Sequence, residues 1–338
     1  MATHLIGRGH VYEPLVLVLP SLLQAIIRGG YQAVPTFFVL SGFVLAKTYA
    51  STQWNRTNLW KYLVGRFARV YPVYLLSLAI VLPFIIKAKD QPKGWLVAMH
   101  LTLMQGWFAG HYTVGWNTPA WSLSCEIFFY LAFPLLIIPT KNWGRKRTVW
   151  LALGACVMTQ AMWLCGISDQ IKPLVHLSDF VMGIAVYRAF DLLTARRLAP
   201  SGKWLYTTGM IGSGVILAYA QYLPKMISMN TLLRPMNAML LLGLGLGGGW
   251  MARVLSTRPV VYLGKASYGM YILHIPILWW AVSWPSFAVK YLYVAFVVAL
   301  SCVVYTTMEE PANRFIRSMV KPRSRRMSAD LAVERMVA

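Results

Sequence analysis

The sequence predicts an all-α protein, a polytopic transmembrane helix bundle. Hydrophobic residues occupy 58% of its 338 positions and charged residues 12%, about half the charged share of roughly a quarter found in soluble domains. The apolar residues gather into segments that approach the roughly 20 residues a helix needs to cross a bilayer core. Lysines and arginines lie between these segments, as in the cytoplasmic loops of membrane proteins.

Nine apolar segments are predicted to cross the membrane, because each is long enough, or nearly so, to span the bilayer core. In chain order they cover residues 34–50, 70–86, 121–139, 149–166, 177–193, 205–222, 235–252, 267–281 and 288–307. Two further apolar stretches are excluded. Residues 95–105 are too short to span comfortably, and residues 14–27 are short and interrupted by Pro20.

The basic loops indicate the orientation of the chain. Positive loops accumulate on the cytoplasmic side, and the basic groups share one side only if residues 95–105 do not cross. These groups are Lys47, Arg56, Lys61, Arg66 and Arg69; the run 141–147; Arg188, Arg196, Arg197 and Lys203; Arg253, Arg258 and Lys265; and Arg314 to Arg326. We therefore expect residues 1–31 outside, a transmembrane domain over 32–317, and a basic, disordered cytoplasmic tail over 318–338, in the cell (inner) membrane.

The net charge of +22 does not indicate a nucleic-acid-binding protein. Its lysines and arginines occur in short runs between apolar segments, where they are suited to face anionic lipid, so we expect no nucleic-acid partner. The four cysteines lie inside apolar stretches without metal-ligand spacing. We expect them to pack as small hydrophobic residues, and we expect no metal site.

The N-terminus does not resemble a signal peptide, because it has neither a charged start followed by an apolar run nor a cleavage site. Nine spans with a cytoplasmic C-terminus place residues 1–31 outside, whereas a protein of this type would more usually begin inside. The count therefore predicts a further helix before Met1. A short start site, a partial gene or a divergent N-terminus would each explain its absence.

Five motifs follow one another along the chain. They are Phe37-Phe38-Val-Leu-Ser41-Gly42-Phe43; Arg66-Phe-Ala-Arg69-Val-Tyr71-Pro72-Val-Tyr74; Trp121-Ser122-Leu-Ser124-Cys-Glu126 with Tyr130 and Pro134; Tyr268-Gly-Met-Tyr271-Ile-Leu-His274-Ile-Pro276; and Tyr305 with Glu310-Pro311. In this order, over residues from about 30 to about 317, the chain resembles the membrane-bound acyltransferase 3 family. These are integral membrane O-acyltransferases that modify carbohydrates. The resemblance implies ten membrane helices, an acyl-CoA donor and no tightly bound cofactor.

The resemblance also implies a catalytic histidine. Members carry an arginine in the first helix and, about ten residues later, a histidine taken to be the base; here the arginine would lie before Met1, and the histidine would be His4 or His10. We favour His4, because Ala-Thr-His before a polar stretch resembles the end of a shortened first helix. The alternative is that both are solvated terminal histidines, in which case the chain would be inactive. Imidazole suits removal of a hydroxyl proton near neutral pH, and we expect direct transfer without an acyl-enzyme.

Arg66 and Arg69 form the pair that, in this family, resembles a coenzyme A phosphate site. Guanidinium groups make bidentate contacts to phosphate oxygens, and a spacing of three places both on one face of a helix start. Tyr71 and Tyr74 complete the motif and are assigned with them to donor binding. The alternative is that the arginines are positive-inside anchors beside two tyrosines of the interface belt.

Glu126 lies inside an apolar run, where a carboxylate costs about 2.5 kcal/mol or more unless it faces a partner or water. It is a candidate catalytic residue; the alternative is that it pairs with a buried arginine or histidine. Trp121, Ser122 and Ser124 precede it at the start of the same helix and are candidates for substrate binding.

His274 lies well inside a predicted span. It is a further catalytic candidate if it faces a water-filled cavity, although a lone histidine on an apolar face is more often satisfied by a neighbour. Asp179 has a weaker claim of the same kind. Glu309 and Glu310 are expected to pair with basic residues, and Gly42 is expected to allow close helix packing.

The predicted function is transfer of an acyl group, expected to be acetyl, from acyl-CoA on the cytoplasmic side to a hydroxyl of a carbohydrate or lipid-linked glycan. The acyl group or the acceptor must then cross the membrane plane, and Glu126 and His274 are the polar residues available at mid-depth. The alternative is a transporter or exporter of a lipid-linked sugar without acyl transfer. It predicts inverted repeats, which the sequence does not show. A catalytically inactive scaffold is the third hypothesis.

Overall fold

The computed structural model contains helices and no strand in the residues it describes, which confirms the predicted all-α class. Those residues are 18–20, 23–24, 27, 29–87, 94–108, 116–167, 171–195, 202–219, 222, 232–247, 249–283 and 287–320. The predicted tail, 318–338, and the N-terminal segment, 1–31, therefore lie largely outside the described residues.

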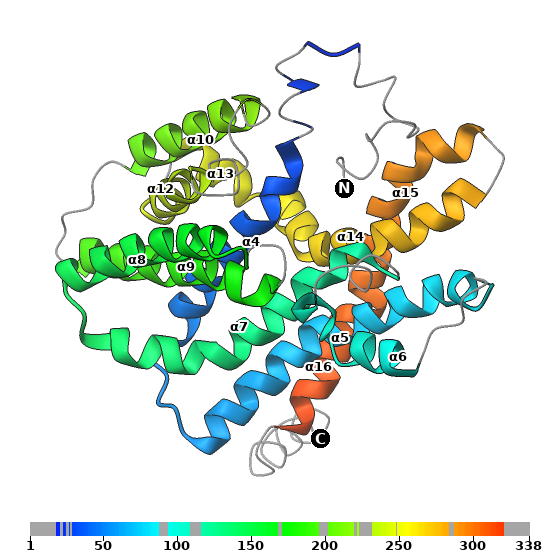
Figure 1. Cartoon of the computed structure of the whole chain (residues 1–338), viewed down its shortest axis with the longest axis horizontal. Helices are drawn as coiled ribbons and strands as arrows, with labels where there is room; N and C mark the ends of the chain where they lie inside the picture. Colours follow the sequence, from blue (N-terminus) through cyan, green and yellow to red (C-terminus); the bar gives the residue numbers. More distant parts are fainter. Residues whose placement is uncertain are drawn as a thin grey trace, which may run out of the picture.

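Twelve α-helices make up most of the described chain, and each predicted apolar segment is helical over most of its length (Figure 1). They are α4 (Ala33–Tyr49), α5 (Arg56–Lys87), α6 (Gly94–Leu101), α7 (Trp121–Ile137), α8 (Arg145–Leu164), α9 (Lys172–Ala195), α10 (Gly202–Tyr219), α12 (Leu233–Gly245), α13 (Gly249–Leu255), α14 (Arg258–Ser283), α15 (Phe287–Val304) and α16 (Glu310–Met319). A π-helical segment, Tyr305–Glu309, joins the last two.

Three helical stretches are long and apolar enough to cross a membrane by themselves: Arg56–Lys87, Thr118–Asn142 and Leu292–Met319. The pair α12 and α13, which meet at 82°, pass the same test only when taken together as one broken span. The other described helices are shorter or less apolar. A helical protein with several membrane-spanning segments is thus supported, whereas the count of nine spans remains a prediction.

Helix α5 begins much earlier than predicted, at Arg56 rather than near residue 70. At 1.5 Å per residue its 32 residues extend about 48 Å, well beyond the roughly 30 Å of a bilayer core. Arg66 and Arg69 therefore lie inside a helix that is longer than its apolar part, and not in a polar loop or at a helix start. Hydrophobicity alone marked only the apolar part of this helix.

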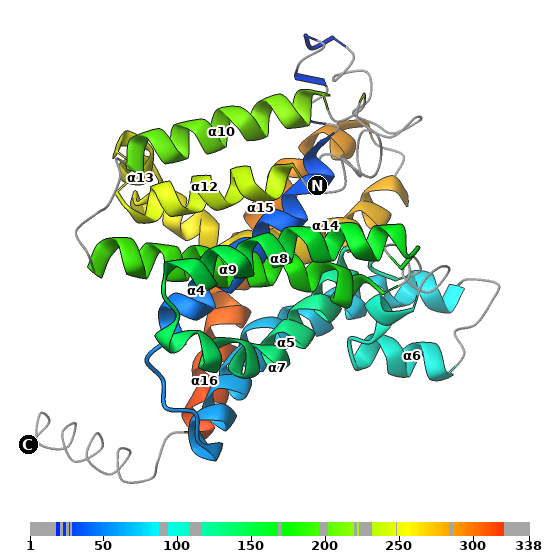
Figure 2. The same ribbon diagram turned by 60° about the vertical axis from the view of Figure 1, so that its left-hand side comes forward.

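Helices α4 and α9 cross at the centre of the bundle (Figures 1 and 2). A Cβ atom on Gly42 would lie 2.1 Å from the carbonyl oxygen of Phe180, and one on Gly183 would lie 2.0 Å from that of Val39. The two backbones are in direct contact, which only glycine allows. The predicted packing role of Gly42 is confirmed.

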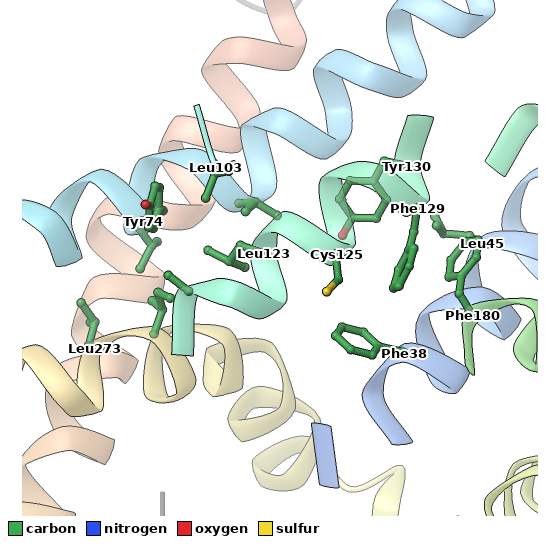
Figure 3. Close-up of a cluster of buried hydrophobic side chains, with 14 of the residues drawn as sticks. Phe38, Leu45, Tyr74, Leu103, Leu123, Cys125, Phe129, Tyr130, Phe180 and Leu273 are labelled. Atoms are coloured by element: carbon green, nitrogen blue, oxygen red, sulfur yellow. The ribbon is translucent and has the colours of Figure 1, made fainter. Parts of the chain in front are cut away.

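Aromatic side chains fill the space where α4, α7 and α9 meet (Figure 3). Phe129 stacks on Phe180 with 4.9 Å between ring centroids, and Phe38 meets Phe129 edge to face at 5.2 Å. Such pairs each contribute about 0.5–1.5 kcal/mol beyond the apolar area they bury. This cluster holds α7, and with it Glu126, in a fixed position relative to α4.

Candidate active site

A cavity of about 330 Å³ lies where α4, α5, α7 and α14 meet. Phe38 and other apolar residues of α4 form one side. Its polar side chains come from all four helices and are Ser41, Arg66, Arg69, Ser122, Glu126, Tyr130, Ser267, Tyr268 and Tyr271. Residues from four of the five sequence motifs therefore meet at one place.

Arg66 and Arg69 both line this cavity, one turn apart on α5. The guanidinium carbon of Arg66 lies 5.7 Å from the ring centroid of Tyr49 and 5.9 Å from that of Tyr130, within cation–π range. Its Nε atom is buried and has no hydrogen-bond partner among the described residues. Within the described part of the chain, no carboxylate forms an ion pair with either arginine. Both guanidinium groups are available to an anionic ligand.

Glu126 faces the same cavity from α7. Its Oε2 atom accepts a hydrogen bond of 2.8 Å from the hydroxyl group of Tyr130, one turn further along the helix. In the regions that the structure describes, no arginine or histidine lies within 4.0 Å of this carboxylate. The alternative that Glu126 pairs with a buried arginine or histidine therefore finds no support there. One carboxylate and two guanidinium groups share the cavity without forming an ion pair.

Tyr71 and Tyr74 do not line the cavity, although both belong to the arginine motif. Tyr71 donates a 2.8 Å hydrogen bond to the carbonyl oxygen of Leu101, and Tyr74 a 2.7 Å bond to that of His100. The two tyrosines attach the end of α6 to α5. The prediction that they join the arginines in binding the donor is not supported by this placement, because their hydroxyl groups already serve backbone carbonyls.

Among the three residues predicted to bind substrate, only Ser122 lines the cavity, and it donates a 2.9 Å hydrogen bond to the carbonyl oxygen of Pro119. Ser124 is buried and accepts a 3.0 Å hydrogen bond from the backbone N–H of Gly106. Trp121 packs against the rings of Phe38 and His176. Ser124 and Trp121 thus belong to the packing around the cavity and not to its lining.

His274 lies outside the cavity lining, one turn beyond Tyr271 on α14. Its side chain is fully buried, and its Nδ1 atom lies 2.7 Å from the carbonyl oxygen of Tyr271. The hydroxyl group of Tyr293 donates a hydrogen bond to the carbonyl oxygen of His274. His274 is therefore enclosed by residues with which it forms hydrogen bonds, and its side chain does not line the cavity. The other two histidine candidates, His4 and His10, lie outside the described residues.

Asp179 belongs to a separate buried cluster. It accepts a 2.7 Å hydrogen bond from the Nε atom of Arg234, and its other oxygen lies 2.9 Å from Nδ1 of His176. Arg234 also donates to the carbonyl oxygen of Ala155. The cluster connects α9, α12 and α8 and does not line the cavity. At the surface, Glu310 pairs with Arg314 at 2.5 Å, as predicted, whereas Glu309 forms no ion pair with a described residue.

Sequence reasoning assigned no role in the site to Tyr49, which contacts Arg66, or to Tyr130, which lines the cavity. The position of Tyr130 beside Glu126 could have been predicted, because residues four apart on a helix lie on the same face and Tyr130 follows Glu126 at that spacing. Tyr49 contacts Arg66 from the end of α4, and no local pattern reveals a contact between different helices.

Comparison with known proteins agrees with the motif order. The sequence profile of the acyltransferase 3 family, described as an acyltransferase domain, matches residues 2–308. The chain is 28% identical to the acyltransferase MdmB of Streptomyces mycarofaciens over 85% of this chain and 82% of that protein. It is 25% identical to the peptidoglycan O-acetyltransferase OatA of Listeria monocytogenes over 74% of this chain and 45% of that protein.

The O-acetyltransferase OatA of Staphylococcus aureus is 21% identical over 87% of this chain and 53% of its own length. The chain thus spans about half the length of the OatA proteins. No solved structure matches it significantly. The family profile covers most of the chain, and the chain therefore belongs to the acyltransferase 3 family and is an acyltransferase that transfers groups other than amino-acyl groups.

Proposed function

We propose that this protein transfers an acyl group from acyl-CoA to a hydroxyl group of a carbohydrate or lipid-linked glycan. The acyl group that we propose is acetyl. The observation that carries the proposal is the shared cavity in which Arg66, Arg69 and Glu126 meet from two helices without pairing with one another. Relatives named as O-acetyltransferases, one of them acting on peptidoglycan, support the reaction class and the acceptor class. The family match does not favour a lipid-linked sugar exporter without acyl transfer.

The donor is proposed to enter from the cytoplasmic side. The part of α5 that carries the arginines projects beyond its apolar stretch, next to basic loops that mark the cytoplasm in the nine-span topology. Two guanidinium groups on one helix face suit a diphosphate, because each makes bidentate hydrogen bonds to phosphate oxygens. The buried and unpaired Nε atom of Arg66 supplies one such donor.

The chemical step is attack of the acceptor hydroxyl oxygen on the thioester carbonyl carbon. The new C–O bond forms, the C–S bond breaks, and the hydroxyl proton passes through a base to the departing coenzyme A thiolate. Among the described residues that line the cavity, Glu126 is the carboxylate that can accept that proton. The histidine that the family uses, His4 or His10 here, is proposed to act in the same step.

The cavity lining also favours direct transfer. Two of its three serines, Ser122 and Ser267, donate their hydrogen bonds to backbone carbonyl oxygens, and no histidine lines the cavity among the described residues. A serine nucleophile needs an adjacent base to become reactive. An acyl-enzyme on Ser122 is therefore not part of the proposal.

The test is acetyl transfer from labelled acetyl-CoA by the full-length protein in membranes, followed by identification of the labelled glycan. Arg66→Gln and Arg69→Gln are expected to raise the KM for acetyl-CoA by about tenfold or more, as expected for the loss of one charge-assisted contact. Arg56→Gln removes a cation of the same helix that does not line the cavity and is the matched control. Membranes that transport a lipid-linked sugar but never incorporate the label would overturn the proposal.

A further inference from the structure

A second cavity, of about 730 Å³, lies beside the first turns of α5. The turn after α4 forms one wall, through Tyr49 and Thr52, and α16 forms another, through Arg317. Lys61 and Gly65 of α5 complete it. Figure 2 shows α16 next to the end of α5 where this cavity lies.

This second cavity is positively charged, and its described lining holds no counter-charge. Lys61 and Arg317 line it, and none of the described lining residues is an aspartate or a glutamate. Neither cation forms an ion pair with a described residue, and Arg317 makes one long hydrogen bond, of 3.5 Å, to the carbonyl oxygen of Gly65. Two cations around one hollow favour an anionic ligand.

Tyr49 connects the second cavity with the candidate active site. Its side chain lines the second cavity, and its hydroxyl oxygen lies 3.5 Å from Nη2 of Arg66, which lines the first. Both cavities also lie along α5, with Lys61 and Gly65 in one and Arg66 and Arg69 in the other. One elongated ligand can therefore reach both, passing the contact between Tyr49 and Arg66.

Gly65 contributes to the shape of the second cavity. A Cβ atom at this position would lie 3.5 Å from Nη2 of Arg317, in ordinary van der Waals contact. The glycine thus leaves the guanidinium group of Arg317 close to the backbone of α5 without a side chain between them. A side chain longer than alanine would press against the guanidinium group of Arg317.

We propose that the second cavity binds the nucleotide end of the acyl donor, with Lys61 and Arg317 contacting the 3′-phosphate of its adenosine moiety. This rests on the proposed function, in which Arg66 and Arg69 hold the diphosphate of the same molecule. A coenzyme A thioester has the required order of groups: a phosphorylated nucleoside, a diphosphate, and an extended arm that ends in the thioester. The two cavities receive the two ends of one substrate.

The experiment compares coenzyme A with dephospho-coenzyme A, which lacks only the 3′-phosphate. Affinities are measured with the full-length protein in nanodiscs of neutral phosphatidylcholine. Wild-type protein is expected to prefer coenzyme A by about tenfold or more, as for one or two charge-assisted contacts. Lys61→Gln and Arg317→Gln are each expected to reduce this preference severalfold and to leave the affinity for dephospho-coenzyme A unchanged. That result would identify Lys61 and Arg317 as contacts of the 3′-phosphate.

Three matched variants control for charge and folding. Arg314→Gln removes a cation of α16 that pairs with Glu310 and does not line the cavity, so it is expected to keep the wild-type preference. Arg56→Gln serves the same purpose on α5. Lys61→Arg keeps the charge and is expected to retain the preference. Equal loss of both affinities in the glutamine variants would overturn the proposal.

Anionic lipid headgroups share the phosphate chemistry, so the measurements are repeated in nanodiscs that contain phosphatidylglycerol. If the second cavity binds lipid, phosphatidylglycerol would stabilise the wild-type protein, and Lys61→Gln and Arg317→Gln would abolish this stabilisation without changing the preference for coenzyme A over dephospho-coenzyme A. That result would overturn the proposal. If affinity depends on Arg66 and Arg69 but not on Lys61 and Arg317, the nucleotide site is wrong and the proposed function stands. If wild-type protein binds no coenzyme A, both are wrong.

Discussion

The hydroxyl group of Tyr130 donates a 2.8 Å hydrogen bond to Oε2 of Glu126, one turn earlier on α7, and both residues line the cavity that Arg66 and Arg69 also line. The carboxylate is held by a neutral partner although two cations line the same cavity. A hydrogen bond from tyrosine orients the carboxylate and leaves its second oxygen without a hydrogen-bond partner among the described residues. This arrangement suits a group that exchanges a proton with a bound substrate better than a closed ion pair would.

Replacing Glu126 with glutamine is expected to reduce kcat for acetyl transfer by about a hundredfold or more, the range associated with loss of a general base. The amide keeps the shape and can still accept the hydrogen bond from Tyr130, but it cannot take a proton. Glu310→Gln, on the exposed start of α16, is the control and is expected to leave kcat unchanged. An unchanged kcat in Glu126→Gln would exclude the proposed base.

Tyr130→Phe is expected to lower kcat by a smaller factor than Glu126→Gln. The variant removes one hydrogen bond and keeps the ring near Arg66, so the carboxylate loses its orientation but not its chemistry. The double variant should be no slower than Glu126→Gln alone, because the two residues act through one group. Additive losses would show that Tyr130 acts independently.

Gly183→Ala is expected to lower the unfolding free energy by about 2 kcal/mol or more, because its Cβ would lie 2.0 Å from the carbonyl oxygen of Val39 and force α4 away from α9. Gly154→Ala is the matched control, since a Cβ there meets nothing within 4 Å. It is expected to be neutral or to stabilise α8, by up to about 1 kcal/mol. Thermal unfolding of the detergent-solubilised variants measures both.

Asp179→Asn is expected to destabilise the protein by about 3–5 kcal/mol, because it leaves the buried guanidinium group of Arg234 without its counter-charge. Combining Asp179→Leu with Arg234→Met removes both charges and should recover most of the loss. Equal instability of the single and the double variant, measured by thermal unfolding, would contradict this account.

Burial lowers the pKa of His100 from its ordinary value of 6.5 to about 4. The imidazole of His100 therefore binds a proton less readily in the folded protein than in the unfolded chain. The free energy of unfolding is highest above pH 6.5 and falls as the pH drops toward 4. Below pH 4 the free energy of unfolding is expected to be lower by on the order of 3 kcal/mol.

His100→Phe is expected to flatten that pH dependence. A phenyl ring can keep the stacking on Trp116, where the ring centroids lie 4.4 Å apart, and it cannot be protonated. Unfolding temperatures of both proteins between pH 7 and pH 4 provide the measurement. A parallel decline in the variant would assign the pH dependence to other groups.

Much of the fold and part of the site could be predicted from local patterns. The apolar segments became helices, and the spacing of Arg66 and Arg69 brought both into one cavity, because each property depends on residues close in sequence. The same patterns did not predict the contacts of Tyr71 and Tyr74, whose hydroxyl groups donate hydrogen bonds to carbonyl oxygens near the end of α6. They also missed the early start of α5, because its first turns are polar and hydrophobicity identifies only the apolar part of the helix.

The sequence by itself determined the all-α class, the family and the membership of Arg66, Arg69 and Glu126 in a common set of motifs. Only the tertiary structure decided that Glu126 binds Tyr130 and not an arginine, that His274 lies outside the cavity, and that Lys61 and Arg317 line a common second cavity. The reason is physical: helix formation and membrane affinity depend on local sequence, whereas contacts between helices depend on how close their backbones approach. In this bundle the glycines at the crossing of α4 and α9 set that approach.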